Sequence, residues 1–147
     1  MQTHQISNLF RPNPPLGQRV QVQGWVRTKR DSKAGFSFVA VHDGSSFDSI
    51  QAVIPATLSN YTSDVLALST GCSVTIIGDL TASEGRGQAV EIQATSVEVH
   101  GWVDDPETYP IAKKRHTFEY LRSVAHLRPR TNTFGAITRV RTVLANA

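Results

Sequence analysis

The sequence predicts a mainly β protein: a five-stranded barrel with one helix between the third and fourth strands, followed by a linker and helices. Three observations lead to this fold class. Apolar and polar side chains alternate in several runs before residue 101, as in strands that bury one face. Turn signals containing glycine or proline separate these runs. Helical periodicity dominates only near the C-terminus.

The first strand is predicted over residues 19–27, which read RVQVQGWVR. Val20, Val22 and Val26 share one face of this run, and the residues between them are mostly polar. Gly24 lies inside the run and indicates a bend or a bulge, because glycine in a strand interior often marks such a position.

The second and third strands are predicted to form a hairpin. Residues 36–41 form an apolar run that ends at the turn signal Asp43-Gly44. Residues 49–54 form the next run, and Pro55 stops it. We interpret Asp43 as a turn residue and not as part of a catalytic pair.

A short helix and two further strands complete the predicted barrel. The helix is expected over residues 62–69, with Gly71 as its C-terminal stop. Strands follow over residues 72–80 and 88–100, joined by a turn at 84–87. The apolar positions change phase along the last strand, which predicts a bulge near Thr95-Ser96.

This order of elements matches the five-stranded OB-fold. In that fold the binding face centres on strands 2 and 3, with the 1–2 and 4–5 loops at its rims. The predicted 1–2 loop holds a cluster of four cations within seven residues: Arg27, Lys29, Arg30 and Lys33. Phe36 and Phe38 follow at strand spacing. Cations neutralise phosphate and exposed aromatic rings stack on unpaired bases, so the stretch indicates a single-stranded nucleic acid.

Charge is distributed unevenly along the chain. Residues 1–101 carry seven Lys and Arg against eight Asp and Glu, whereas residues 102–147 carry eight against four. The positive charge of the barrel is therefore local, which favours a local contact over a diffuse basic surface. From charge alone, a solvated hairpin with no partner is an equal alternative.

Composition excludes several classes of protein. No apolar run approaches the roughly 20 residues of a membrane span, and the N-terminus has no secretory signal, so we expect no membrane partner. Cys72 is the single cysteine, which rules out an internal disulfide and suggests a reducing compartment. The five histidines are scattered and predict no metal site.

We divide the chain into four segments. Residues 1–18 are proline-rich and read as an irregular lead-in, residues 19–101 as the barrel, and residues 102–131 as a linker or hinge. A short amphipathic helix is expected over residues 113–121 of that linker. Residues 132–147 are strongly helical, with an apolar stripe made by Phe134, Ile137, Val140 and Leu144. We expect this helix to be poorly ordered or packed against another chain, as the front of a longer polypeptide.

Several separated blocks resemble the bacterial asparaginyl-tRNA synthetases, which are class IIb aminoacyl-tRNA synthetases. They are GWVRTKRDSKAGFSFVAVHDGS, IQAVI, GCSVTIIGDL, VEIQATSVEVHGWVDDPETYP and KKRHTFEYLRSVAHLRPRTNTFGAITRVR. The resemblance implies an OB-fold that binds the GUU anticodon of tRNA-Asn, a hinge, and the start of a class II catalytic domain. For the parent enzyme it implies an asparagine–tRNA ligase that uses ATP and Mg²⁺, forms a homodimer, acts in the cytoplasm and does not bind DNA.

The resemblance also implies a limit. Of the three class II signature motifs, only the helix leading into the first fits within these residues. The chain alone is therefore expected to hold no cofactor and to be inactive in aminoacylation. Whether it is an isolated domain or a natural fragment stays open.

The resemblance assigns roles to four residues that would contact bases. Phe38 would stack on the central uridine, unless it is a core phenylalanine. Gln51 would read that uridine, since an amide offers the donor and acceptor that match the uracil edge. Arg30 would contact the same base or its phosphate. Glu91 would accept from N1–H and N2–H₂ of guanosine, the first anticodon base.

Other residues are candidates for the remaining contacts. Arg27, Lys29 and Lys33 would contact phosphates and set affinity more than base choice. The reader of the third base is not assigned, and Arg86 and Gln88 in the 4–5 loop are the candidates. Solvent-exposed strand or loop positions with no ligand remain the alternative for each polar residue.

Two other functions stay open. One is a freestanding OB-fold that binds single-stranded nucleic acid without base preference. The other is a non-catalytic interaction module that dimerises through its C-terminal helix.

Overall fold

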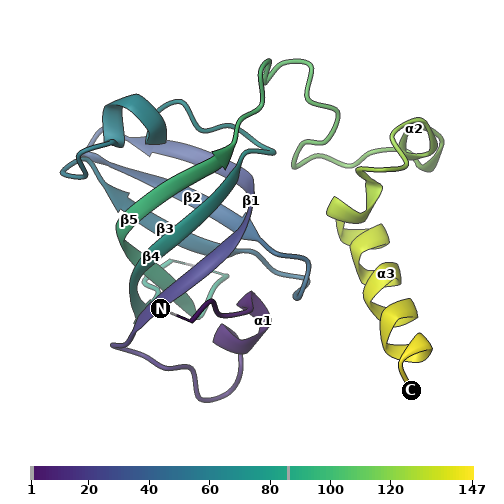
Figure 1. Ribbon diagram of the computed structural model, residues 1–147, viewed down its shortest axis with the longest axis horizontal. Helices are drawn as coiled ribbons and strands as arrows, with labels where there is room; N and C mark the ends of the chain where they lie inside the picture. The colour runs from purple at the N-terminus through teal and green to yellow at the C-terminus, as the bar shows by residue number, and fades with distance from the viewer. Residues whose placement is uncertain (1, 86) are drawn as a thin grey trace.

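The computed structural model describes residues 2–85 and 87–147, and its centre is a closed five-stranded barrel (Figure 1). The strands are β1 (Arg19–Ser32), β2 (Phe36–His42), β3 (Ile50–Pro55), β4 (Ser73–Ala82) and β5 (Val90–Gly101). They close in the order β1-β2-β3-β5-β4, and only the β3–β5 pairing is parallel. The predicted fold class is confirmed.

The barrel closes because β1 is long enough to pair with two strands. Its first half pairs with β4 and its second half with β2, so that Trp25 has partners on both sides. The β1–β2 register shifts between Val26 and Thr28, three residues after the bend or bulge expected at Gly24. Gly24 instead allows the backbones of β1 and β2 to approach closely, because a Cβ there would overlap the backbone carbonyl of His42.

The bulge predicted in β5 is confirmed. Ile77 pairs with Ser96 and Gly78 pairs with Ala94, which leaves Thr95 as the extra residue. The bulge keeps apolar side chains pointing inward on both sides of it, since the inward positions change parity there.

A short helix, α1 (Ile6–Leu9), lies against the lower end of the barrel in Figure 1. Both Ile6 and Leu9 are fully buried in the core. The backbone N–H of Ile6 donates to Asp43 Oδ2 at 2.9 Å, so the turn after β2 holds the start of α1. The lead-in is therefore not wholly irregular, although nothing in its local periodicity announces this helix.

The segment between β3 and β4 covers the other end of the barrel. The predicted eight-residue helix is wrong in extent: the observed element, η1, is a single π-helical turn over Tyr61–Val65. Tyr61 and Val65 enter the core while Leu66 stays 43% exposed, so the segment lacks the continuous apolar face of a longer helix.

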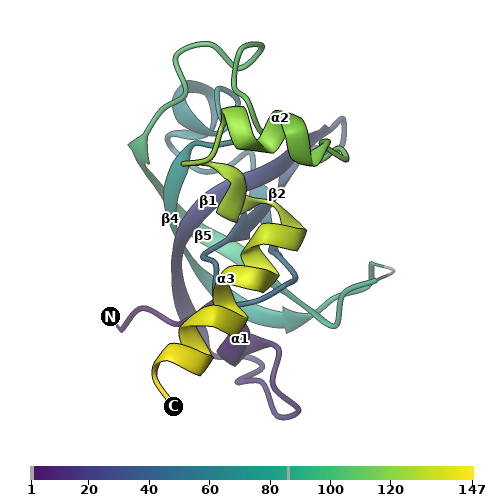
Figure 2. The same ribbon diagram turned by 90° about the vertical axis from the view of Figure 1, so that its right-hand side faces the viewer.

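Three helices follow the barrel: α2 (Phe118–Ser123), the 3₁₀ turn η2 (Arg128–Arg130) and α3 (Asn132–Ala145). Helix α2 begins and ends later than the helix expected over residues 113–121. Helix α3 stands beside the barrel (Figures 1 and 2). Its apolar stripe is not covered, since Val140 is 58% and Leu144 71% exposed. Within the described residues, no helix is long and apolar enough to cross a membrane.

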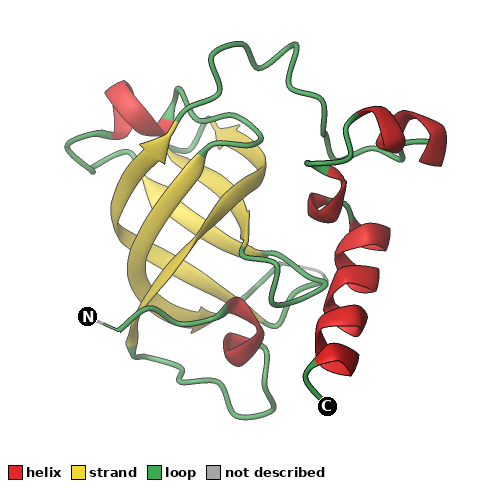
Figure 3. Ribbon diagram, turned by 45° about the vertical axis from the view of Figure 1, so that its right-hand side comes forward, coloured by secondary structure: helices red, strands yellow, loops and turns green. Residues whose placement is uncertain are grey.

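The linker is attached to the barrel through aromatic side chains. The Tyr109 ring lies over Gly71, and Ile111 is buried. The guanidinium of Arg130 lies 4.5 Å from the ring centre of Trp25 and donates to Tyr109 Oη at 2.8 Å. Barrel and linker are thus joined by packing and a cation–π contact as well as by the chain. Figure 3 shows the linker crossing from the barrel to the helices.

Candidate nucleic-acid interface

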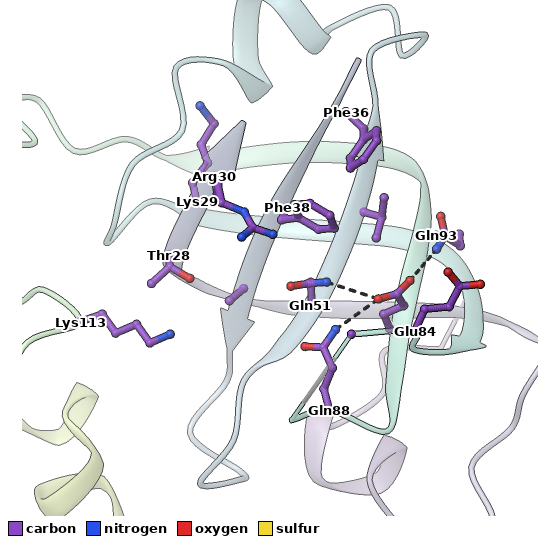
Figure 4. A pocket seen from close by; sticks show the side chains of 14 residues that line it. Thr28, Lys29, Arg30, Phe36, Phe38, Gln51, Glu84, Gln88, Gln93 and Lys113 are labelled. Atoms are coloured by element: carbon purple, nitrogen blue, oxygen red, sulfur yellow. Dashed lines mark hydrogen bonds between the residues drawn. The ribbon is translucent and has the colours of Figure 1, made fainter. Parts of the chain in front are cut away.

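A groove of about 720 Å³ lies on the outer face of the barrel (Figure 4). Its floor consists of the second half of β1 with β2, β3 and the start of β5. The β4–β5 loop contributes Glu84, Gly85 and Gln88 to one side, and Lys113 of the linker reaches in from another. We call this the outer groove.

The strand register brings the floor residues together in two rows. One row runs Arg30, Phe38, Val53 and Gln93 from β1 to β5. The neighbouring row runs Thr28, Ala40, Gln51 and Glu91. Side chains that share a row or adjoin across rows are within contact distance on one face of a sheet. The small side chain of Ala40 leaves space between the ring of Phe38 and the polar groups of the second row.

Phe38 lies on the outer face and not in the core. Ser37 and Val39 beside it are fully buried, and strand alternation therefore turns Phe38 outward. Its ring meets Phe36 edge to face, with centroids 5.1 Å apart. The guanidinium carbon of Arg30 lies 4.6 Å from the Phe38 ring centre. Two aromatic rings and a cation thus form an accessible platform in the groove.

Glu91 is the centre of a hydrogen-bond network in the groove, and dashed lines in Figure 4 mark its bonds with the labelled Gln51, Gln88 and Gln93. Its Oε2 accepts from Gln51 Nε2 at 3.3 Å, from Gln88 Nε2 at 3.2 Å and from Ser83 Oγ at 2.8 Å. Its Oε1 accepts from Gln93 Nε2 at 3.0 Å. Three amides and a carboxylate therefore present donors and acceptors side by side, which is what the polar edge of a base requires.

The four clustered cations do not all lie in the loop between β1 and β2. Strand β1 continues to Ser32, so of the four only Lys33 lies in the turn, where it is exposed. Alternation along β1 starts Arg30 and Lys29 on opposite faces of the strand, although the long side chain of Lys29 still lines the groove. Lys29 Nζ donates to Asp31 Oδ2 at 2.9 Å and to the carbonyl of Leu66 at 2.8 Å.

Lys29 belongs to a polar network under η1. The Ser37 hydroxyl donates to Asp31 Oδ1 at 2.6 Å and is bonded to Tyr61 Oη at 2.7 Å. The hydrogen bond from Ser37, followed by that from Lys29, holds the pKa of Asp31 below its ordinary value. The ammonium of Lys29 is thus already satisfied, although the side chain lines the groove.

Arg27 is not brought to the outer groove. Its guanidinium donates to the carbonyl of Arg130 and, at 3.0 Å, to Asn132 Oδ1, and burial lowers the pKa of this side chain. It therefore joins β1 to the start of α3. The sequence predicts a phosphate contact for Arg27, whereas in the structure its guanidinium is engaged by Arg130 and Asn132.

The groove gathers most of the predicted base readers and adds residues that sequence reasoning missed. The predicted site residues that line it are Lys29, Arg30, Phe38, Gln51, Gln88 and Glu91. Arg86 lies outside the described residues. Thr28, Glu84, Gln93 and Lys113 were missed. Gln93 could have been found from its strand spacing to Glu91, whereas nothing in the sequence pairs Lys113 with the barrel.

Comparison with known proteins agrees with this geometry. A family model for the tRNA anti-codon group, described as an OB-fold nucleic acid binding domain, matches residues 20–103. The chain belongs to this family. As in other OB-fold nucleic acid binding domains, its outer groove lies over strands 2 and 3.

Two relatives are similar over nearly the whole chain. The asparagine–tRNA ligase of Hahella chejuensis (strain KCTC 2396) is 63% identical over 147 residues, which are 100% of this chain and 32% of that protein. The asparagine–tRNA ligase of Klebsiella pneumoniae subsp. pneumoniae is 61% identical over 142 residues, or 97% of this chain and 30% of that protein. This OB-fold chain therefore spans about a third of the length of these curated relatives.

A solved structure shares the arrangement. The asparaginyl-tRNA synthetase from Pyrococcus horikoshii superposes with a TM-score of 0.74 at 25% identity, covering 88% of this chain and 30% of that one. Among the described residues, no group of three or more His, Cys, Asp or Glu side chains is placed to hold a metal ion.

Proposed function

We propose that the outer groove recognises the GUU anticodon of tRNA-Asn. The observation that carries this proposal is the aromatic platform of Phe38 facing an amide and carboxylate network across one groove. Stacking accepts any base, while the polar edge of the base must find complementary donors and acceptors. The similarity to asparagine–tRNA ligases supports tRNA-Asn as the partner.

Phe38 is proposed to stack on the central uridine. The Arg30 guanidinium now lies over that ring, so the arriving base takes its place. Arg30 then turns to the base or to its phosphate, where a charged hydrogen bond replaces the cation–π contact. Stacking on an aromatic side chain contributes about 1–3 kcal/mol per base.

Gln51 is proposed to read the edge of the same uridine. It lies one row away from Phe38, beside the space above Ala40. A base stacked on Phe38 thus presents its edge toward the amide of Gln51. The amide supplies both a donor and an acceptor, as pairing with uracil requires.

Glu91 is proposed to accept from N1–H and N2–H₂ of the first anticodon base, guanosine. Its carboxylate already binds amides of Gln51, Gln88 and Gln93, and these can give way to donors of the base. Adenine lacks that pair of donors, so it cannot replace the amides, and hydrogen bonds to a charged group worth about 1.5–3 kcal/mol each would not form.

The third base and the phosphates complete the proposal. Gln88 and Arg86, both in the β4–β5 loop, are the candidates for the third base. Of these, Gln88 lies among the described residues and lines the groove. Lys33, exposed in the β1–β2 turn, is proposed to contact a phosphate. Lys29 and Arg27 would need to leave their present partners to do so.

The whole protein is proposed to be an asparagine–tRNA ligase. Its relatives carry that name, and this chain covers only 32% and 30% of their lengths. ATP, Mg²⁺, the homodimer and the cytoplasmic location belong to that larger protein. The present 147 residues are proposed to supply recognition and not catalysis.

Binding of anticodon stem-loops tests the proposal. The chain should bind a GUU stem-loop more tightly than a loop of unrelated sequence and the same length. Gln51→Ala should weaken binding to the GUU loop far more than to the unrelated loop. Equal affinity of the unchanged protein for both loops would instead indicate a freestanding OB-fold without base preference. No binding at modest salt would favour the interaction module.

A further inference from the structure

A second cavity of about 400 Å³ adjoins the outer groove at the junction of β1, the linker and α3. We call it the hinge cavity. Its charged and ionisable lining residues are Arg27, Lys113, Lys114, Arg115 and His116. Lys113 lines both the hinge cavity and the outer groove, so its side chain marks the place where the two meet.

The two cavities differ in charge. The outer groove contains the carboxylates of Glu84 and Glu91. Among the described residues, no carboxylate lines the hinge cavity. Figure 4 shows Lys113 entering beside Thr28, on the side away from Glu84. The outer groove therefore has an acidic and amide side and a cationic side, and the cationic side continues into the hinge cavity.

The backbone around Lys113 is held in place. Ile111, two residues before it, is buried against the barrel, and Tyr120 Oη donates to the carbonyl of Pro110 at 2.8 Å. The N–H of Ala112 donates to the ring of His116 at 3.2 Å. Within residues 2–85 and 87–147, no hydrogen bond or ion pair engages the Lys113 ammonium. A fixed backbone thus offers an available cation at the rim of the groove.

We propose that the backbone of the bound RNA leaves the outer groove over Lys113 and enters the hinge cavity, where Lys114 and Arg115 take further phosphates. The acidic side of the groove repels phosphate, so the bases point toward Glu91 and the backbone lies on the cationic side. This inference rests on the proposed function and adds the path of the strand to it. It makes the linker part of the RNA-binding surface.

Salt dependence of binding to the GUU stem-loop tests this path. For a single strand, each phosphate contact contributes about 0.7 to the slope of log K against log salt concentration. Lys113→Gln should lower the magnitude of that slope by about 0.7. At about 50 mM salt, it should weaken binding by roughly 3- to 10-fold. The loss should be the same for the GUU loop and the unrelated loop, since phosphates carry no sequence information.

Arg122→Gln is the matched control. Arg122 is an exposed cation on α2 and lines neither cavity, so its loss changes net charge equally. Its salt slope should stay that of the unchanged protein. If Lys113→Gln and Arg122→Gln give the same slope while the unchanged protein still prefers the GUU loop, the path is wrong and the proposed function stands. If that preference is absent, the proposed function itself fails.

Discussion

Gln51 and Glu91 are register partners across the parallel pairing of β3 and β5, and Gln51 Nε2 donates to Glu91 Oε2 at 3.3 Å. This pair joins two strands that are distant in sequence. The β3–β5 pairing closes the barrel, so the same contact that completes the fold also places an amide beside a carboxylate in the outer groove.

Gln51→Glu tests this relationship directly. The substitution places two carboxylates opposite one another, and like charges in register partners are unfavourable. We expect the free energy of unfolding at pH 7 to fall by roughly 0.5–1 kcal/mol, with part of the loss recovered in high salt. Urea unfolding at two salt concentrations measures it. Gln23→Glu, on an exposed position of β1 that pairs with β4, is the control and should change stability less.

Phe38→Ala should weaken binding of the GUU stem-loop by about 1–3 kcal/mol, or roughly 5- to 150-fold. The reason is the loss of the stacking face in the groove. Phe47→Ala is the control, because Phe47 is 58% exposed but does not line the outer groove. Fluorescence anisotropy with labelled RNA gives both dissociation constants. Similar losses in the two variants would show that the ring of Phe38 is not a specific platform.

His42 predicts a pH dependence of stability. Burial, followed by repulsion from Arg27 and Arg130, lowers the pKa of His42 to about 4. The unfolded chain, with a pKa near 6.5, binds this proton more readily, so stability should fall as pH drops from about 6.5 to 4. Because the side chain keeps partial exposure, the contribution is of order 1–2 kcal/mol after discounting for solvent screening.

Urea unfolding at pH 7 and pH 4.5 checks this dependence. His42→Gln should flatten the difference in unfolding free energy between the two pH values. The control is His126→Gln at an exposed position, which should leave the difference as it is in the unchanged protein. A difference that persists in full in His42→Gln would assign the pH dependence to other groups.

Gly71→Ala should loosen the linker from the barrel. Gly71 has φ of +100°, and a Cβ there would overlap the ring of Tyr109. Displacing that ring also removes the acceptor of the Arg130 hydrogen bond. We expect faster proteolytic cleavage within residues 102–116 and a loss of stability greater than the roughly 1–2 kcal/mol of backbone strain.

Gly35→Ala separates the two contributions. Gly35 has φ of +86°, and a Cβ added there would have nothing within 4 Å, so alanine adds strain without overlap. Linker proteolysis in Gly35→Ala should match that of the unchanged protein. Equal cleavage rates in both alanine variants would mean that Tyr109 does not anchor the linker.

Local periodicity predicted five strands in the observed chain order, although β1 continues to Ser32, five residues beyond its predicted end. The alternation around Val20 and Val22 is visible in the chain, and the phase change that marks the bulge at Thr95 is as well. Such patterns depend on neighbours along the chain, because one face of each strand must be buried. Helix η1 departed from its predicted extent because packing over the barrel end, and not helical periodicity, decides which residues enter the core.

The sequence by itself determined the fold class, the family resemblance and most of the base-reading candidates. Tertiary structure decided which way each of them faces. Barrel register turned Phe38 outward, and tertiary contacts distinguished Lys29, which bonds to Asp31 and Leu66, from Arg30 within one cationic cluster. It also brought Lys113 to the groove, 83 residues after Arg30 in the chain. The direction in which a side chain points and its neighbours from distant parts of the chain depend on closure of the barrel. Closure joins strands by hydrogen bonds that no local pattern specifies.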